Sequence, residues 1–282
     1  MASRHTRAGG ISPLVLGVVV VGAVVVGLVA AAFALRSALG QPTAAVVPSF
    51  AAPPPLLDSA PSLQPWPAVP AARVPPLGYD VSHPQCRRSL PPDGGFAIVG
   101  VTGGHPFSSN QCVGEQLAWA FKKHGHAVYV NSGFPGTGDP VAYGTAIAND
   151  AVAREHAQTG RGTAVWWLDV ETANTWNGTV QQNATVLDAI ASRLQQLGAR
   201  VGIYSTPAMW SQIAGDWAPG LPVWYATGPG TAQSAAAACA NSFAGSAAAV
   251  VQWVQKTALG VFDHNMVCPA YQNRARELLD LG

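Results

Sequence analysis

The sequence predicts an α/β fold, a closed TIM-like β/α barrel that begins at Leu77 and runs to Gly282. In this part of the chain, short apolar runs alternate with stretches of helical periodicity, and such alternation is typical of a parallel sheet. Seven or eight strand–helix units within about 200 residues favour closure of that sheet into a barrel. An open, doubly wound sheet is the structural alternative. No glycine-rich nucleotide-binding motif follows the first strand, so the alternative lacks its usual functional signature.

The strand candidates are short apolar segments bounded by turn residues. In chain order they are Leu77–Ser82, Phe96–Thr102, Ala127–Asn131, Thr163–Glu171, Arg200–Ser205, Pro222–Ala226 and Ala249–Gln255. The helix candidates carry apolar residues at steps of three and four positions. They are Gly114–His124, Pro140–Gln158 and Thr179–Leu197.

In barrel enzymes the carboxyl ends of the strands form the catalytic face. Several strand candidates carry a polar residue there, namely Asp80, Thr102, Asn131, Glu171 and Ser205. Any one of them fits an ordinary turn, and Asn131 fits one best. The carboxylates Asp80, Asp169 and Glu171 together are harder to explain in that way.

The region before the barrel is expected to anchor it. Leu14–Leu35 is an uncharged apolar run of about 22 residues, long enough to cross a bilayer as a helix. Arg4 and Arg7 precede it, so residues 1–13 are expected to stay in the cytoplasm while the rest is exported. A cleaved signal peptide is the alternative, because small residues near the end of the run suit a cleavage site. The barrel is thus expected outside the cytoplasm, held by a single-pass helix or, if that segment is cleaved, secreted.

Residues 36–76 are dominated by proline and alanine. Runs such as Pro53-Pro54-Pro55 cannot join a helix or a sheet ladder, and they favour a semi-rigid, polyproline-II-like spacer. The expected order along the chain is therefore a short cytoplasmic segment, a membrane helix over residues 14–35, this spacer, and a barrel domain over residues 77–282.

Charge and composition narrow the choice of partners. Charged residues make up 10% of the chain and the formal net charge is +1, so no basic field indicates a nucleic acid partner. The seven histidines are not spaced as a metal site, and the glycine-flanked serine of the α/β-hydrolases is missing. We therefore expect no cofactor and no metal.

The four cysteines, Cys86, Cys112, Cys239 and Cys268, all follow the predicted anchor, and none forms a C-x-x-C pair. This usage indicates two disulfides in an oxidising compartment rather than zinc or redox chemistry. Three pairings are possible. We expect Cys86–Cys112 and Cys239–Cys268, because each pairing closes a loop of moderate length near one end of the barrel domain.

The segment from Trp166 to Glu171 is an apolar run that ends in two carboxylates spaced two residues apart. In an extended strand Asp169 and Glu171 project from the same side, about 6–7 Å apart. Because two such close charges cannot both ionise easily, one pKa is raised, which suits a proton donor. Glycoside hydrolysis needs such a pair, one acid for the leaving oxygen and one anion for the developing cation. The alternative is a polar strand end with solvated carboxylates.

Five motifs in order give the chain a family resemblance. They are Gly78-Tyr79-Asp80-Val81-Ser82-His83, Leu168-Asp169-Val170-Glu171, Gly202-Ile203-Tyr204-Ser205 with Trp210, Val223-Trp224-Tyr225-Ala226, and Asp263-His264-Asn265. In these motifs the chain resembles the family 25 glycoside hydrolases, lysozymes that cleave the muramic acid linkage of peptidoglycan. The resemblance covers essentially all of the chain from Leu77 to Val267.

The resemblance implies a catalytic role for four carboxylates. Glu171 would be the general acid/base, and Asp169 either the nucleophile or the group that orients a participating N-acetyl group. Asp80 and Asp263 would line the same pocket. Three aromatic residues would be sugar-stacking or pocket-wall groups, namely Tyr204, Tyr129 and Trp224. The implied partner is peptidoglycan or a related cell-wall glycan.

The sequence also departs from the family pattern. The segment Gly100–Gly104 lacks the lysine and glutamate that usually end the second strand, and Tyr129-Val130-Asn131 keeps only the first residue of the usual third-strand trio. The late W-Q-Y motif is altered at Val251-Gln252-Trp253. Two hypotheses follow: an exported, membrane-tethered muramidase, or a catalytically weak or inactive barrel that binds cell-wall glycan.

Overall fold

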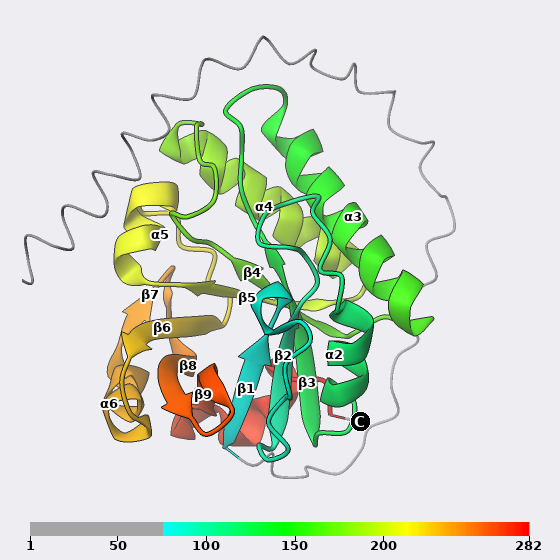
Figure 1. The fold of residues 1–282 in the computed structure, drawn as a ribbon. Helices are drawn as coiled ribbons and strands as arrows, with labels where there is room; N and C mark the ends of the chain where they lie inside the picture. Colours follow the sequence, from blue (N-terminus) through cyan, green and yellow to red (C-terminus); the bar gives the residue numbers. More distant parts are fainter. Residues whose placement is uncertain (1–75, 282) are drawn as a thin grey trace, which may run out of the picture. The chain divides into compact units, whose positions relative to one another are not determined.

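The computed structural model describes residues 76–281, and they form a closed barrel of eight strands with helices on its outer side (Figure 1). The predicted anchor and all but the last residue of the predicted spacer lie outside the described residues. Within 76–281, no helix is both long enough and apolar enough to cross a membrane.

The barrel strands follow one another in the order β1-β2-β3-β4-β5-β6-β8-β9, and β9 pairs with β1 to close the ring. The strands β1 to β6 and β8 run parallel, whereas β9 runs antiparallel to both of its neighbours. The bounds are β1 Leu77–Val81, β2 Phe96–Gly100, β3 Gly125–Asn131, β4 Val165–Asp169, β5 Arg200–Ser205, β6 Val223–Pro229, β8 Ser246–Thr257 and β9 Gly260–Val267, and a short strand β7, Ser242–Phe243, pairs with β8 outside the ring.

The closed barrel is confirmed, but the prediction of parallel strand–helix units throughout is wrong in its last part. The strands β8 and β9 form an antiparallel hairpin with no helix between them. The strand β9 was not predicted, because its centre is the polar Asp263-His264-Asn265 rather than an apolar run. Two predicted strand ends are also too long: β2 ends at Gly100 and β4 at Asp169, so Thr102 and Glu171 lie beyond their strands.

Local signals in the sequence explain where the helices begin. The helix α3 is capped by Asp139 and starts at a proline, and α4 starts with a capping box between Thr179 and Gln182. The helices α5 and α6 were not predicted, although Thr206 and Thr231 cap them in the same manner. The bounds are α2 Val113–Ala120, α3 Pro140–Thr159, α4 Val180–Gln196, α5 Pro207–Ala214 and α6 Ala232–Ala237, with short 3-10 helices at His83–Gln85, Ala238–Ala240 and Pro269–Glu277.

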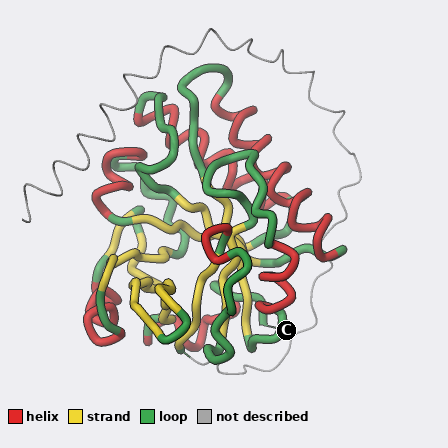
Figure 2. The backbone as a smooth tube through the Cα atoms, viewed as in Figure 1, coloured by secondary structure: helices red, strands yellow, loops and turns green. Residues whose placement is uncertain are grey.

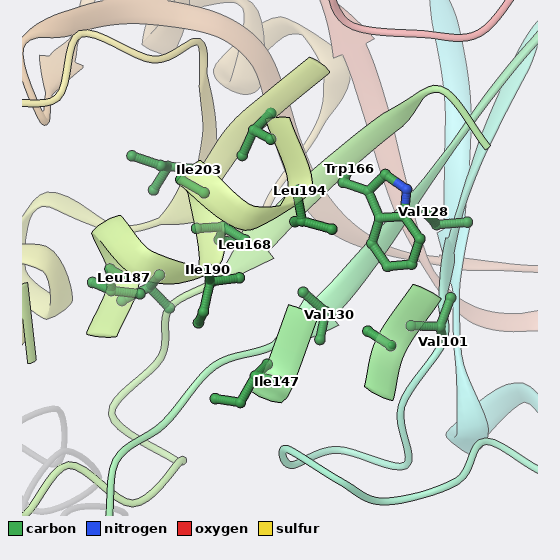
Figure 3. Close-up of a cluster of buried hydrophobic side chains, with 14 of the residues drawn as sticks. Val101, Val128, Val130, Ile147, Trp166, Leu168, Leu187, Ile190, Leu194 and Ile203 are labelled. Atoms are coloured by element: carbon green, nitrogen blue, oxygen red, sulfur yellow. The ribbon is translucent and has the colours of Figure 1, made fainter. Parts of the chain in front are cut away.

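An outer hydrophobic core joins these helices to the strands. Alternate residues of β3, β4 and β5 face outward and meet the inner faces of α3 and α4 (Figure 3). Figure 2 shows the long helices gathered over this part of the barrel. The labelled members of the cluster are Val101, Val128, Val130, Ile147, Trp166, Leu168, Leu187, Ile190, Leu194 and Ile203.

The other alternate residues fill the inside of the barrel. Trp167 and Trp224 meet there with ring centroids 5.8 Å apart, and Phe96 and Ile98 belong to the same cluster. A side chain at Gly202 would come within 2.3 Å of the Trp167 ring, so glycine at that position leaves room for the indole. The polar side chains of the candidate site lie above this apolar layer, towards the carboxyl ends of the strands.

The C-terminal segment closes the opposite end of the barrel. Leu278 and Leu279 are fully buried and, with Ala275, pack against the inner cluster. Asp280 exchanges two backbone hydrogen bonds with His126 at the start of β3. The inner core is therefore completed by residues that lie more than 100 positions after β2, β3 and β4, which supply part of the same cluster.

Both predicted disulfides are confirmed. Cys86 pairs with Cys112, and Cys239 pairs with Cys268. The first ties the loop after β1 to the start of α2, and the second ties the 3-10 helix Ala238–Ala240 to the end of β9. Each bond therefore fastens a connection that carries little secondary structure of its own.

We expect reduction of the disulfides to lower the melting temperature of the barrel domain by about 10–20 °C, because the bonds span 26 and 29 residues and each contributes about 3 kcal/mol. Thermal unfolding with and without reductant measures this. A double variant, Cys239→Ser with Cys268→Ser, serves as an intermediate case. An unchanged melting temperature in protein whose four thiols are shown to be free would contradict the prediction.

Candidate active site

A cleft of about 380 Å³ lies at the carboxyl ends of the parallel strands. Four carboxylates, two tyrosines, one tryptophan and one glutamine form its polar wall, and small or apolar side chains from β6, β8 and α5 complete it. The lining residues are Asp80, Tyr129, Asp169, Glu171, Tyr204, Thr206, Met209, Trp224, Ala226, Gly228, Gln252, Val254 and Asp263. None of them is lysine, arginine or histidine.

All seven residues that the sequence proposed for the site line this cleft. The four carboxylates come from β1, the β4 region and β9, which are distant in the sequence. Trp224 has an exposed fraction of only 1%, so its ring serves as a wall of the cleft rather than as a stacking platform. The structure brings the residues together, and their individual roles remain predictions.

The backbone between the two central carboxylates is held from β5. The Val170 N–H donates to Tyr204 O at 3.0 Å, and the Ser205 hydroxyl donates to Val170 O at 2.7 Å. After this anchored residue the chain turns, and Glu171 O accepts hydrogen bonds from Asn174 N and Trp176 Nε1. Ser205 does not line the cleft, but it fixes the segment that carries Asp169 and Glu171.

Two side-chain amides hold Asp80. Its Oδ2 accepts from Asn265 Nδ2 at 2.6 Å and from Gln252 Nε2 at 3.0 Å. Each amide oxygen accepts in turn from a fixed donor, Trp224 Nε1 at 2.7 Å for Asn265 and the Tyr204 hydroxyl at 2.9 Å for Gln252. Asp80 is therefore oriented by neutral donors that are themselves oriented.

A side-chain amide also holds Asp169. Its Oδ2 accepts from Asn131 Nδ2, and Asn131 Oδ1 accepts from the Thr102 hydroxyl at 2.7 Å. The other oxygen, Asp169 Oδ1, is buried and has no hydrogen-bond partner within residues 76–281. The amide of Asn131, which the sequence interpreted as a turn residue, is thus part of the site.

Burial dominates the electrostatics of the cleft. It raises the pKa of Asp80 well above its usual range, and the Asp263 carboxylate raises that pKa further, against the hydrogen bonds from Asn265 and Gln252. Burial likewise raises the pKa of Asp169, with added contributions from Glu171 and Asp80. The pKa of Asp263 is raised to about 6 by burial and by Glu171. Four carboxyl groups this close cannot all ionise at neutral pH, so the cleft retains protons.

Glu171 also has a raised pKa, mainly because of burial, and the nearby Tyr204 hydroxyl opposes the shift. The Tyr204 hydroxyl donates its single proton to Gln252, so burial is the larger influence on Glu171. Burial raises the pKa of Tyr204 and Tyr129 well above the ordinary value, which keeps both phenols neutral. Within the described residues no cluster of three or more histidine, cysteine or acidic side chains is arranged to hold a metal ion.

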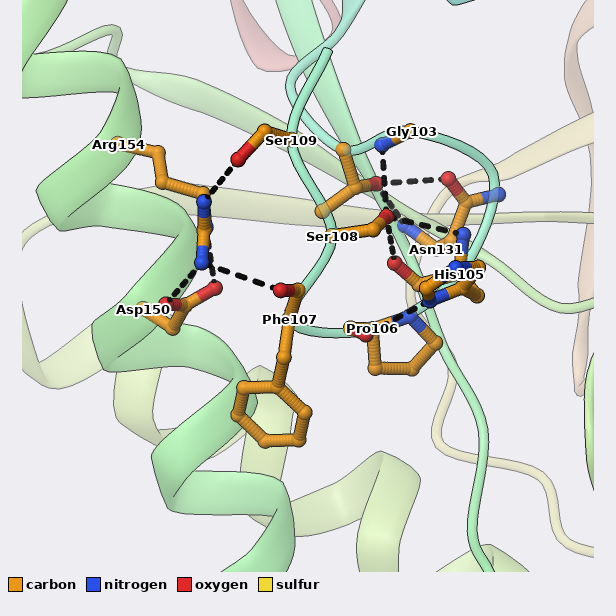
Figure 4. Close-up of polar contacts among 10 residues, drawn as sticks. Gly103, His105, Pro106, Phe107, Ser108, Ser109, Asn131, Asp150 and Arg154 are labelled. Atoms are coloured by element: carbon orange, nitrogen blue, oxygen red, sulfur yellow. Dashed lines mark hydrogen bonds and ion pairs between the residues drawn. The ribbon is translucent and has the colours of Figure 1, made fainter.

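The loop after β2 borders this region and is held by α3. Arg154 pairs with Asp150 at 2.6 Å and donates to Ser109 Oγ and to Phe107 O (Figure 4). Inside the loop, the Ser108 hydroxyl accepts from Gly103 N at 2.8 Å and donates to His105 O. This loop occupies the place where the sequence departs from the family 25 pattern.

Sequence reasoning missed the amide partners of the carboxylates and the contribution of α5. Gln252 and Asn265 share a barrel face with the carboxylates because side chains alternate along β8 and β9, but β9 was not recognised as a strand. Thr206 and Met209 enter the cleft at the start of α5, whose signal was a threonine followed by proline.

Comparison with known families matches residues 146–252 to the family described as Lysozyme-like protein 1. Two relatives align over shorter stretches. "Probable GH family 25 lysozyme 4" of Dictyostelium discoideum is 35% identical over 66 residues, which cover 23% of this chain and 30% of the relative. "Lysozyme-like protein 1" of Caenorhabditis elegans is 37% identical over 62 residues, 21% of each chain. The aligned stretches therefore span less than a third of either relative.

Solved structures share the fold over most of the chain. The spore cortex lytic enzyme SleM of Clostridium perfringens has a TM-score of 0.54 at 16% identity, covering 72% of this chain and 69% of that one. A muramidase from Acremonium alcalophilum has a TM-score of 0.52 at 17% identity, covering 72% and 99%. A glycosyl hydrolase 25 of Streptococcus pneumoniae has a TM-score of 0.53 at 18% identity, covering 73% and 94%. At such identities the likeness establishes the fold.

The closed barrel with a carboxylate-lined cleft at the carboxyl ends of its strands defines a glycoside-hydrolase-like β/α barrel. Within that class, the resemblance to the family 25 glycoside hydrolases is confirmed, because lysozyme-like or family 25 proteins recur in the family match, the sequence relatives and the structural neighbours.

The raised pKa of Asp263 predicts a specific dependence of stability on pH. The folded protein holds the Asp263 proton more tightly than the unfolded chain. The protonated carboxyl therefore contributes fully to the free energy of unfolding below pH about 4, and this contribution is lost as the pH rises through about 6. Asp263→Asn stays neutral at every pH. We expect the variant to gain stability relative to the wild type between pH 4 and 7, by up to about 3 kcal/mol.

Urea unfolding of both proteins at several pH values measures the difference in free energy of unfolding. Exposed Asp188→Asn is the matched control and is expected to give a flat difference. A flat difference for Asp263→Asn as well would contradict the raised pKa.

Proposed function

We propose that the chain is a lysozyme-type glycosidase that cleaves cell-wall glycan, with Glu171 as general acid/base. The observation that carries this proposal is the convergence of four carboxylates in one cleft that has no cationic side chain in its lining. The printed names of the relatives and structural neighbours, lysozyme and muramidase, support peptidoglycan as the substrate class.

Glu171 suits the role of acid for a physical reason. Burial raises the pKa of this carboxyl, so a larger fraction of it carries a proton near neutral pH. That proton would pass to the glycosidic oxygen as the bond to the sugar breaks. With the proton gone, the same group would accept one from the incoming water.

In its ionised form, Asp169 would supply the negative charge that faces the developing oxocarbenium centre. Asp169 lies two positions before Glu171. Its Oδ1 has no hydrogen-bond partner within the described residues, and its Oδ2 accepts from the Asn131 amide. Asp80 and Asp263 would keep protons and hydrogen bonds available to sugar hydroxyls. Tyr204 and Tyr129 remain neutral and would contribute phenol groups to the glycan site.

We further propose that residues 14–35 hold the protein in the cell membrane as a single-pass helix, with the barrel outside the cytoplasm. Two observations support this: the uncharged apolar run preceded by two arginines, and two disulfides, which persist in oxidising compartments. The proposed substrate, peptidoglycan, would lie in the same compartment.

Turbidity loss and release of reducing ends from purified peptidoglycan test the glycosidase. Glu171→Gln is expected to lower turnover by about two to four orders of magnitude, since glutamine keeps the shape but has no proton to give. Asp169→Asn is expected to be severe as well. Exposed Glu115→Gln in α2 is the matched control and should keep wild-type turnover.

Two results would reject parts of this proposal. Hydrolysis that survives Glu171→Gln undiminished would exclude Glu171 as the acid. A wild-type barrel that binds peptidoglycan without releasing reducing ends would favour the catalytically inactive glycan-binding barrel, and both variants would then change affinity only modestly.

Membrane attachment has its own test. The full chain expressed in a bacterial host is expected in the membrane fraction, with the barrel digested by protease added outside the cytoplasmic membrane. A chain that starts at residue 41 is expected to stay soluble. Full-length protein of intact mass in the soluble fraction would contradict the anchor, and soluble protein that lacks the apolar run would establish a cleaved signal peptide.

A further inference from the structure

A side-chain amide at the end of β3 connects the loop after β2 with the strand that carries Asp169. Asn131 lies directly opposite Asp169 in the parallel β3–β4 register. The Asn131 Nδ2 group donates to Asp169 Oδ2, and Thr102 Oγ1 donates to Asn131 Oδ1 at 2.7 Å. The exposed fractions of Thr102, Asn131 and Asp169 are 1%, 6% and 5%. These hydrogen bonds are therefore shielded from water, which makes them stronger and their loss more costly.

Both ends of this connection determine the direction of its hydrogen bonds. The Thr102 hydroxyl oxygen accepts from the backbone N–H of Asn131 at 3.1 Å, so its own proton is free for Asn131 Oδ1. At the other end, an ionised Asp169 can only accept. A flipped amide would set its oxygen against a carboxylate oxygen in a buried place. Only one orientation of the Asn131 amide fits both neighbours.

We propose that Thr102 and Asn131 are positioning residues for Asp169. The Thr102 hydroxyl holds the Asn131 amide, the amide holds Asp169 Oδ2, and Asp169 Oδ1 is thereby presented to the substrate. This role deepens the proposed glycosidase function and rests on it.

The state of Asp169 Oδ1 supports this role. The atom is buried and has no partner in the described part of the chain, although Asp169 lines the cleft. A buried acceptor without a donor is costly, so a bound group that brings a donor or a positive centre is favoured there. Because Oδ2 is already engaged by Asn131, Oδ1 is the oxygen left for a bound group.

The pair also stands where the sequence departs from the family 25 pattern. The segment after β2 lacks the family's lysine and glutamate, and the end of β3 keeps only Tyr129 of the family's usual trio. At these two departures the structure holds Thr102 and Asn131, bonded to each other. Arg154 fastens the loop that follows Thr102 (Figure 4). The altered strand ends are therefore consistent with a different support for Asp169 rather than with a lost one.

Thr102→Val tests the pair, because valine keeps the shape and removes the hydroxyl. Without that donor the Asn131 amide is free to turn, and the Asp169 anion loses a charge-assisted hydrogen bond. We expect the acid limb of the kcat profile to move upward by about one pH unit, with kcat on that limb about tenfold lower and KM within about twofold. Thr102→Ser keeps a hydroxyl and is expected to return the acid limb to its wild-type position.

Thr163→Val is the matched control for a purely structural effect. The Thr163 hydroxyl is equally buried and donates to Glu155 Oε1 at 2.9 Å, before β4 begins and away from the cleft. Its removal is expected to lower the melting temperature and to leave the acid limb in place. A shift of the acid limb in Thr163→Val equal to that in Thr102→Val would overturn the proposal.

A titration of the Asp169 carboxyl by carbon-13 NMR needs no turnover, so it separates this inference from the proposed function. Thr102→Val is expected to raise the Asp169 titration midpoint, and Thr102→Ser to restore it. If Thr102→Val does not fold, Asn131→Leu, which removes both side-chain bonds, takes its place with the same expectation. An unmoved midpoint in a folded variant overturns the positioning role. A wild-type protein without turnover overturns the glycosidase alone.

Discussion

The structure of the cleft depends on one electrostatic constraint: four carboxyl groups share a buried space with no cationic side chain in its lining. A lysine or arginine among them would stabilise the anions and lower their pKa values, which would remove the proton that a general acid needs. Neutral amides orient the carboxylates without this loss of the proton. Asn265, Gln252 and Asn131 donate directional hydrogen bonds and bring no full charge. The carboxyl groups can therefore be held in fixed orientations while their pKa values stay raised.

Each of these amides needs a second contact, because a carboxamide that can flip presents either a donor or an acceptor. Trp224, Tyr204 and Thr102 supply it, one donor for each amide oxygen. Trp224, which is buried, and Tyr204, which is partly buried, thus act in the apolar core and in the polar site at once. Their packing against neighbours inside the barrel transmits the rigidity of the core to the carboxylates.

Much of the fold could be predicted, because the seven parallel strands are marked by short apolar runs and the helices α2, α3 and α4 by apolar residues at helical spacing. The hairpin partner β9 could not, since a strand with Asp263 and Asn265 on its inner face has no apolar alternation. The carboxylates were identified through motifs. The role of the amides as their partners was not, because Asn131, Gln252 and Asn265 come from three strands whose register only the closed barrel determines. Local sequence identifies reactive groups more readily than the neighbours that orient them.

The packing of the C-terminal segment under the barrel has a consequence for biosynthesis. Ala275, Leu278 and Leu279 complete the inner apolar cluster that also contains Trp167 and Trp224. In a growing polypeptide that has not yet reached residue 279, the end of the barrel opposite the cleft is therefore uncovered. Tryptophan and phenylalanine rings are then accessible to water and to other chains. Such a species is prone to association with holdases or with itself. The barrel can reach its native state only after synthesis has passed this segment, so folding during elongation is confined to partial, non-functional intermediates.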